Sequence, residues 1–497
     1  MYRKLFIFAV FSALIVLSAG CGNFFRSKEE IRQRSLSQII DGIVDGSGKN
    51  AVWSIAVKEI DSGEYKYLKD PAKNLVPASN VKLFTTASGM NFLGPEFRFR
   101  TIIMADSLPD SNGIIPGNLY IVGGGDPTFS AEFQDGEPAN VFSAWNAELR
   151  EKGIFGVSGF LVGVDTLFHK RSLKESSWEW GDLRYYYAAP CGALSYNDNC
   201  LNIEINAPLD SGPPLISWNP PLTELVVRQS ISISSGISKP EIDADWLFPD
   251  SVLVLTGTFP PGGFAEYDIP VENPAKLFMQ TLELTLGYEG FRNEGSLLFD
   301  EMDFTGDSVA TTDTLLVYQS LPLSEIIEVI NKESVNLYAE QLLRILGREL
   351  YGNGSPKSGL MAVDSLLKSA TMNSKGAHFV DGSGLSRHNW VSALVITDLL
   401  EYCFKADFSE DYINSLPAYG EGTLKNKHNP AGECRILAKT GSMSGVRARS
   451  GYIFFDDKRY VFSILCNNYN CSSAEIEIAL DRIIEAVCLN AVSSYKR

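Results

Sequence analysis

The hydrophobic pattern near the start of the chain predicts a β-hairpin that leads into a buried helix. Residues 51–70 alternate apolar and polar side chains around a turn at 61–63, and this period of two is typical of paired strands. Apolar residues at Val81 and Phe84 then follow the spacing of a helix packed on its neighbours. We therefore expect the hairpin to lead directly into a helix whose first turn carries Ser79.

The middle of the chain has a different pattern. From about residue 97 to 274, short β-like runs alternate with Gly, Pro, Asn and Asp, and helical periodicity is scarce, which predicts an all-β region of two subdomains. Helical patterns then return, followed by a strand pair and a long final helix. The helical patterns cover 273–290, 322–350 and 359–370, the strands 448–457 and 458–468, and the final helix 472–489.

The order of these patterns predicts an inserted region. A chain of 497 residues is too long for a single hydrophobic core. The most economical arrangement is one α/β (α+β) domain formed by residues 39–97 and 275–497, with the β-rich residues 98–274 inserted into it.

The first 21 residues carry the pattern of an export signal. Two basic residues precede an apolar run over 5–17, and small residues separate that run from Cys21. These small residues resemble the lipobox of bacterial lipoproteins, which implies that Cys21 is acylated and that residues 22–38 tether the protein to a bacterial membrane at its periplasmic face. Leu17 lies one place earlier than the leucine of that motif, so cleavage by an ordinary signal peptidase is one alternative. The other is that the apolar run is retained as a membrane anchor, although it is short for a spanning helix.

Charge and cysteine spacing disfavour two classes of function. The formal net charge of -17 disfavours binding to nucleic acid and to anionic lipid. Neither a zinc-type CxxC spacing nor an HExxH motif occurs, so a metal enzyme is disfavoured. In an oxidising compartment, the close spacings Cys191/Cys200 and Cys466/Cys471 permit local disulfides.

Ser79 and Lys82 are the first candidate catalytic pair. A serine and a lysine three residues apart share one face of a helix, so the amine can reach the hydroxyl. The amine accepts a proton only when it is neutral, so burial must lower its pKa from about 10.4. The alternative, which is commoner for an isolated SxxK, is a helix-capping serine beside a solvated lysine.

Two later motifs favour the catalytic interpretation. An SxN motif runs from Ser334 to Asn336 in a helical stretch, and a KTGS motif runs from Lys439 to Ser442 at the end of a strand-like one. The ordered set SxxK, SxN and KTG resembles the active site of penicillin-binding proteins and related β-lactamases. In such a site Ser334 relays a proton between Lys82 and the leaving amine, and Asn336 hydrogen-bonds a substrate amide.

The KTGS residues have expected roles in binding the substrate. Lys439 and Thr440 offer a cation and a hydroxyl to a terminal carboxylate. Gly441 leaves room for the substrate to lie along the strand edge as an added strand. The backbone N–H groups of Ser79 and Ser442 are expected to form the oxyanion hole.

The spacing of the motifs narrows the resemblance. Ser79 and Ser334 are 255 residues apart, a gap that matches the β-rich insertion. With the stretches 117–130, 177–199 and 381–389, nearly the whole mature chain resembles the D-alanyl-D-alanine carboxypeptidase/endopeptidase family of penicillin-binding protein 4 type. The resemblance implies a serine transpeptidase/β-lactamase-like domain with a long insertion, no cofactor, and a serine that penicillins acylate.

Three further positions are expected to lie close to this site. Asp165 matches a position where the family carries an aspartate that meets the side-chain ammonium of a diaminopimelate residue, and a plain turn aspartate is the alternative. Glu340, one helical turn after Asn336, is expected to orient or pack rather than to activate water. The Gly-rich stretch 381–387 is expected to shape the rim of the site.

Together these features predict an exported serine peptidase that acts on peptidoglycan stem peptides. Ser79, deprotonated by Lys82, attacks the carbonyl between two D-alanines or at a D-amino-acid cross-link, and water hydrolyses the acyl-enzyme. The alternatives are a β-lactamase or esterase on the same core, and an inactive cell-wall-binding lipoprotein. The sequence leaves the oligomeric state and the balance of carboxypeptidase and endopeptidase activity open.

Overall fold

The computed structural model describes residues 35–48, 50–168, 177–210, 212–222, 225–247, 252–300, 313–370, 372 and 374–495. The expected export signal over 1–21, with Cys21, lies outside the described residues. The expected tether over 22–38 ends inside helix α3 (Leu36–Gly46), which begins at a capping box between Ser35 and Gln38. Leu36 and Ile40 are buried, so the packed chain begins earlier than predicted.

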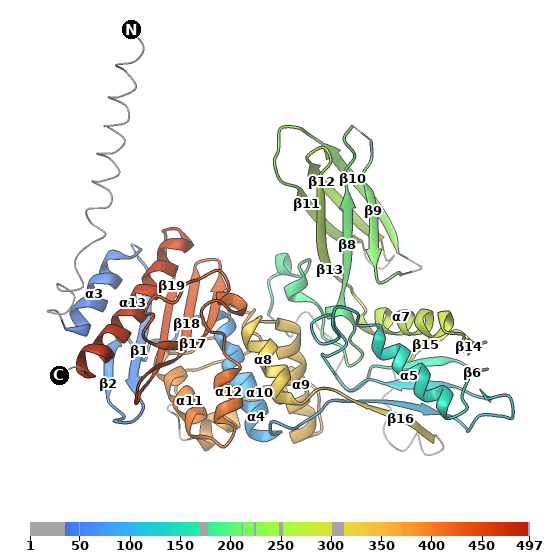
Figure 1. Cartoon of the computed structure of the whole chain (residues 1–497), viewed down its shortest axis with the longest axis horizontal. Helices are drawn as coiled ribbons and strands as arrows, with labels where there is room; N and C mark the ends of the chain where they lie inside the picture. Colours follow the sequence, from blue (N-terminus) through green and yellow to red (C-terminus); the bar gives the residue numbers. More distant parts are fainter. Residues whose placement is uncertain are drawn as a thin grey trace, which may run out of the picture.

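A five-stranded antiparallel sheet organises the main body of the protein, which we define as residues 35–99 and 320–495 (Figure 1). The strand order is β17-β18-β19-β1-β2. Strand β1 pairs with β19 from Val52 opposite Asn467 to Glu59 opposite Tyr460, so the N-terminal hairpin completes a sheet made by the last strands of the chain. The bounds are β1 (Val52–Glu59), β2 (Tyr65–Lys69), β17 (Arg435–Met443), β18 (Val446–Phe455) and β19 (Lys458–Asn467).

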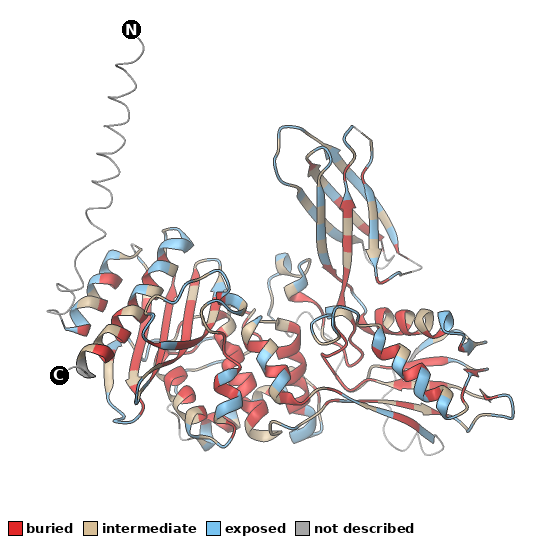
Figure 2. Ribbon diagram, in the orientation of Figure 1, coloured by how far each residue is buried: buried red, intermediate tan, exposed pale blue. Residues whose placement is uncertain are grey.

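Helices cover both faces of this sheet (Figure 1). On one face α3 and α13 (Ser473–Tyr495) share an apolar cluster with the strands. On the other face α4 (Val81–Phe92) is enclosed by further helices and is buried from Val81 to Met90. The remaining helices are α8 (Leu323–Lys332), α9 (Asn336–Tyr351), α10 (Pro356–Ser369), α11 (Ala393–Lys405) and α12 (Ser409–Asn414). Figure 2 shows that buried residues concentrate in this sheet and these helices.

The inserted region, residues 100–319, begins with a second five-stranded sheet of order β15-β7-β5-β3-β16. Its pairs β15-β7 and β7-β5 are parallel, and helices α5 (Asn140–Glu151) and α7 (Pro274–Tyr288) pack on it, so this part is not all-β as the sequence suggested. Its strands are β3 (Arg100–Ala105), β5 (Leu119–Val122), β7 (Leu161–Val164), β15 (Leu297–Asp300) and β16 (Asp313–Gln319), flanked by the short β4 (Ile114–Ile115), β6 (Gly156–Val157) and β14 (Arg292–Asn293).

The boundary expected at residue 275 lies too early. The apolar cluster of the inserted region continues through Phe278 and Leu282 of α7 to Leu316 of β16, and β16 pairs with β3. Residues 274–300 and 313–319 therefore pack with the insertion, because the last strand must return to β3 before the chain re-enters the main body.

The rest of the inserted region is a pair of three-stranded sheets that project from the molecule (Figure 1). Many residues of these strands are exposed or half-buried, as Figure 2 shows. The sheets have the orders β13-β8-β9 and β10-β12-β11, with bounds β8 (Cys200–Asn206), β9 (Leu215–Asn219), β10 (Val226–Ile233), β11 (Glu241–Leu247), β12 (Val252–Phe259) and β13 (Phe264–Pro270).

Helix α9 forms the main contact between the main body and the inserted region. The Tyr338 hydroxyl donates to Asp198 and lies 2.8 Å from Ser130 Oγ. Gln341 Nε2 donates to Ser195 Oγ at 2.8 Å. Because Tyr338 and Gln341 are buried, their hydrogen bonds fix the inserted region against the helix that carries the SxN motif.

The described cysteines are all free thiols, so neither of the local disulfides that the spacing permits is formed. Cys200, Cys403, Cys434, Cys466 and Cys488 are buried, as is usual for reduced cysteine. Among the described helices, none combines the length and hydropathy that crossing a membrane requires.

We expect Tyr338→Phe to lower the free energy of unfolding by about 1–3 kcal/mol, because the buried Tyr338 hydroxyl would lose its hydrogen bonds with Asp198 and with the buried Ser130. Thermal unfolding measures this loss. Tyr288→Phe is the matched control, because the Tyr288 side chain is exposed. Equal melting temperatures for the two variants would contradict the role given to the Tyr338 hydroxyl.

Candidate active site

The candidate nucleophile lies at the start of the buried helix α4. Ser79 is in a short 3₁₀ turn, η1 (Ala78–Asn80), that runs directly into α4. Ala78 has a left-handed backbone with φ of 47°, which is costly for a residue with a Cβ and places strain next to the nucleophile. In this part of the described chain neither helix start has a side-chain cap hydrogen bond, so the capping alternative for Ser79 is not supported.

The Lys82 amine lies within hydrogen-bonding distance of the Ser79 hydroxyl. Its Nζ lies 3.1 Å from Ser79 Oγ, 2.5 Å from Asn336 Oδ1 and 2.7 Å from the Ser383 carbonyl oxygen. The side chain is 0% exposed. Burial lowers the pKa of Lys82 to about 7, although the charges of Asp381 and Glu340 act in the opposite direction. A large share of the amine is therefore neutral near pH 7.

The SxN motif forms the opposite wall. Ser334 has a left-handed backbone with φ of 64°, and Asn336 is the first residue of α9. Ser334 Oγ accepts from Lys439 Nζ at 2.8 Å. Asn336 Nδ2 donates to the Tyr187 carbonyl at 2.8 Å, which fixes the amide so that its oxygen faces Lys82. The structure thus brings the SxxK, SxN and KTG motifs together.

Lys439 is the second buried amine of the site. It lies on β17 and is 0% exposed. Burial and the neighbouring charge of Lys82 hold the pKa of Lys439 well below its usual value. Two amines in one enclosed site disfavour each other's charge, and here the charge of Lys82 lowers the pKa of Lys439.

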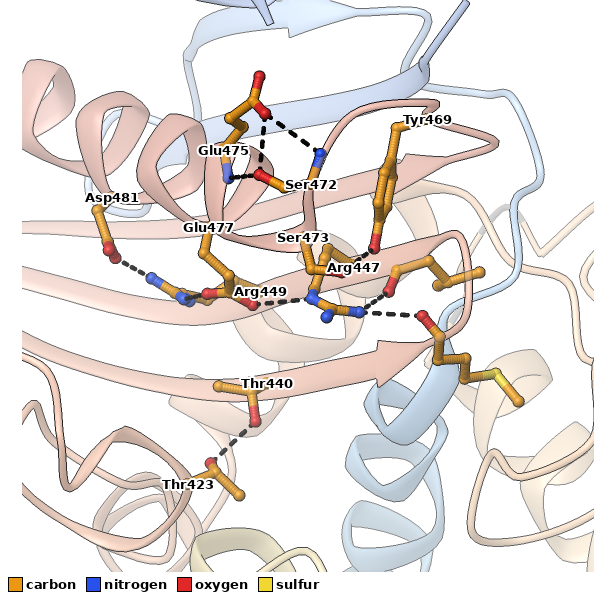
Figure 3. A network of polar contacts seen from close by, with 12 residues as sticks. Thr423, Thr440, Arg447, Arg449, Tyr469, Ser472, Ser473, Glu475, Glu477 and Asp481 are labelled. Carbon is orange, nitrogen blue, oxygen red and sulfur yellow. Dashed lines mark hydrogen bonds and ion pairs between the residues drawn. The ribbon is translucent and has the colours of Figure 1, made fainter. Parts of the chain in front are cut away.

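The KTGS residues lie on β17, the first strand of the sheet order. A Cβ on Gly441 would lie 2.6 Å from the Pro77 carbonyl oxygen and 2.9 Å from Asn80 Nδ2. Gly441 is therefore required for the close approach of β17 to η1. Thr440 Oγ1 lies 2.8 Å from Thr423 Oγ1, and Ser442 is exposed (Figure 3).

An ionic network supports β17 from the neighbouring strand (Figure 3). Arg449 of β18 is opposite Thr440 in the sheet, and its guanidinium is 1% exposed. It pairs with Glu477 at 2.5 Å and with Asp481, both on α13. The last helix of the chain is thereby joined to the strand next to the KTG motif.

The Asp165 carboxylate holds a backbone turn of the inserted region. Its Oδ1 accepts the backbone N–H groups of Ala193 at 2.5 Å and Leu194 at 2.9 Å, which is the turn role that the sequence left open. Asp182 is linked to the SxN motif through Tyr187, because its carboxylate accepts from the Tyr187 hydroxyl at 3.1 Å and the Tyr187 carbonyl accepts from Asn336 Nδ2. The sequence offered a signal for it in the aromatic stretch 177–199.

The stretch 177–190 borders the site and carries exposed aromatic residues. Trp178 Nε1 donates to Asp381 at 3.1 Å, and Arg387 pairs with Glu179 at 2.9 Å. Trp180 is 83% exposed, and Tyr186 is also exposed. In the described residues no group of His, Cys, Asp or Glu side chains is arranged to hold a metal ion.

Comparison with known proteins gives one family. The model of the D-Ala-D-Ala carboxypeptidase 3 (S13) family matches residues 36–487. A D-alanyl-D-alanine carboxypeptidase of Actinomadura sp. (strain R39) is 31% identical over 463 residues, which cover 88% of this chain and 82% of the relative. A D-alanyl-D-alanine carboxypeptidase of Haemophilus influenzae is 26% identical over 391 residues, covering 76% and 77% respectively.

The fold has a counterpart among solved structures. The crystal structure of penicillin binding protein 4 from Haemophilus influenzae has a TM-score of 0.77 and 22% identity, and the match covers 91% of this chain and 99% of that one. This likeness confirms the expected fold class, a serine transpeptidase/β-lactamase-like domain with a long insertion. On the family match over 36–487, the chain belongs to the D-Ala-D-Ala carboxypeptidase 3 (S13) family.

Proposed function

We propose that this protein hydrolyses the D-Ala-D-Ala bond of peptidoglycan stem peptides through an acyl-enzyme on Ser79. The observation that carries the proposal is the fully buried amine of Lys82, 3.1 Å from Ser79 Oγ. An amine in that position is a general base near neutral pH, because its pKa is lowered to about 7.

The reaction follows from the positions of these groups. Lys82 takes the Ser79 proton while Oγ attacks the carbonyl carbon, and the negative charge on the carbonyl oxygen is stabilised by the N–H groups of Ser79 and Ser442. The C–N bond then breaks, and the leaving amine of D-alanine receives a proton through Ser334. Water attacks the ester with Lys82 again as base, which releases the shortened peptide and restores the serine.

Substrate binding is proposed along β17. Lys439 and Thr440 offer a cation and a hydroxyl to the terminal carboxylate, and the Asn336 amide lies beside the peptide. The same groove would accept a cross-linked peptide, so we propose endopeptidase activity as well. We propose Asp182, rather than Asp165, as the carboxylate for a side-chain ammonium of the stem peptide, because Asp165 binds backbone N–H groups.

We propose that β-lactams acylate Ser79 and that the enzyme acts outside the cytoplasmic membrane. A second crystal structure of the Haemophilus influenzae protein is a complex with a β-lactam, at a TM-score of 0.73. Peptidoglycan lies outside that membrane, which supports export by residues 1–21 and a lipid anchor at Cys21.

Ser79→Ala is expected to abolish labelling by a fluorescent penicillin and release of D-alanine, because no nucleophile remains. Mass spectrometry of the penicillin-treated wild type should place the adduct on the peptide that contains Ser79. Ser88→Ala, a buried serine of the same helix, is the control and should keep both activities. An adduct on another residue, or continuous turnover of penicillin by the wild type, would favour a different mechanism or a β-lactamase.

Acylation is expected to increase with pH through about pH 7. The pKa of Lys82 lies near 7, so the base is protonated and inactive below that value and neutral above it. The rate constant should rise about tenfold per pH unit below pH 6 and level off above pH 8. Stopped-flow measurement of penicillin acylation between pH 5 and 9 tests this, and an increase only near pH 10 would show an unperturbed amine.

Asp182→Asn is expected to raise KM about tenfold for a peptide with a free side-chain amine, because a charge-assisted hydrogen bond is lost. The same peptide with its amine acetylated should show no change between wild type and variant. Asp165→Asn should give the same KM ratio for the two peptides as the wild type. If Asp165→Asn rather than Asp182→Asn raised KM only for the peptide with the free amine, Asp165 would be the carboxylate that binds the ammonium.

A further inference from the structure

Two carboxylates that take no part in the proposed chemistry are buried behind the catalytic amine. Glu340 lies on α9 one turn after Asn336, and Asp381 begins the loop 381–386. Their side chains are 4% and 2% exposed. A buried carboxylate is costly unless its oxygens accept hydrogen bonds, so its donors show which part of the structure it holds in place.

Three of the donors are consecutive backbone N–H groups of that loop. Glu340 Oε1 accepts from Gly382 and from Ser383, each at 2.9 Å. Asp381 Oδ1 accepts from Gly384 at 2.8 Å. The two carboxylates therefore fix the orientation of every peptide group between residues 381 and 384.

One of these peptide groups contacts Lys82. The Ser383 carbonyl and the Gly384 N–H belong to the same trans peptide and point in opposite directions. With the N–H on Asp381, the carbonyl oxygen is 2.7 Å from Lys82 Nζ. Gly384 has φ of 84°, and a Cβ there would lie 2.0 Å from the Ala78 carbonyl oxygen, so the loop packs directly against the nucleophile turn.

The Ser383 carbonyl limits how a neutral Lys82 can hydrogen-bond. Asn336 Oδ1 and the Ser383 oxygen can only accept, whereas the Ser79 hydroxyl can also donate. A neutral amine has two N–H groups and one lone pair. When its N–H groups are donated to Asn336 and Ser383, the lone pair is left for the Ser79 proton.

We propose that Glu340 is a positioning residue for the peptidase reaction. By holding the Gly382 and Ser383 N–H groups, it fixes the two peptide groups that lead to the Ser383 carbonyl, and Asp381 holds the next one through Gly384. The Ser383 carbonyl then faces Lys82, and the lone pair of Lys82 is directed at Ser79. This inference deepens the proposed function and rests on it. Glu340 itself stays out of contact with the substrate.

The charge of Glu340 adds a second, measurable effect. The charged groups around Lys82 are Glu340 on α9, Asp381 in the loop and Lys439 on β17, with Arg344 beside Glu340 and Glu333 beside Lys439. The two carboxylates raise the pKa of Lys82 against the effect of burial. Burial and the charge of Asp381 raise the pKa of Glu340 itself to about 7, so its charge is complete only above that value. Loss of this charge lowers the pKa of Lys82 and moves the upper part of the acid limb to lower pH.

Three variants separate these effects. Glu340→Gln keeps the shape and an accepting oxygen but loses the charge, Glu340→Ala loses both, and Glu349→Gln removes an exposed carboxylate of the same helix as a control. Each is measured by its penicillin acylation rate from pH 5 to 9, by thermal unfolding, and by an NMR titration of the Lys82 amine.

We expect Glu340→Gln to stay within about tenfold of the wild-type maximum while its acid limb and the Lys82 titration move to lower pH. Glu340→Ala should acylate about 100-fold more slowly at every pH, because the lone pair is no longer aimed. Glu349→Gln should match the wild type.

Two results overturn the proposal: an acid limb and a Lys82 titration in Glu340→Gln that match the wild type, or a folded Glu340→Ala that acylates at the wild-type rate. If Glu340→Ala does not fold, Glu340→Gln decides alone. If penicillin acylates no form of the protein, the proposed function fails, and the NMR titration still tests the link between Glu340 and Lys82.

Discussion

The structure depends on keeping one amine out of water and still hydrogen-bonded. Lys82 from α4 meets its acceptors on α9 and on the loop 381–386, which are distant in sequence. A buried amine without such acceptors would cost several kcal/mol. The helices around α4 supply the burial, and Asn336 and Ser383 supply the oxygens, so the same packing that stabilises the core also makes the base reactive.

The inserted region supports the groups that accept hydrogen bonds from Lys82, rather than Ser79 itself. Its Tyr187 carbonyl orients the Asn336 amide, and its Trp178 indole donates to Asp381. Tyr338 then ties α9 to Asp198. These contacts lie behind the groups that bind Lys82, so the insertion supports the geometry around its amine.

The motifs SxxK, SxN and KTG could be identified from the sequence because they are short and each marks one local structure, and the structure brings them together. The sequence also predicted the terminal hairpin and strand pair from their period of two. It missed α5, since one helix among short strands gives a weak periodic signal, and it ended the insertion too early, because the pairing of β16 with β3 is a contact over 200 residues apart. The roles of Gly441 and Asp182 depend on neighbours that no local pattern identifies.

The pairing of β3 with β16 has a consequence for how such a protein can arise. Arg100 and Gln319 lie opposite each other, so the chain leaves the main body and returns to it at one place. Adjacent ends leave the host fold undisturbed, and the strand pair itself closes the long loop, whose entropic cost grows only slowly with length. A smaller ancestral enzyme could therefore gain or exchange the whole segment in one recombination event without rebuilding its core.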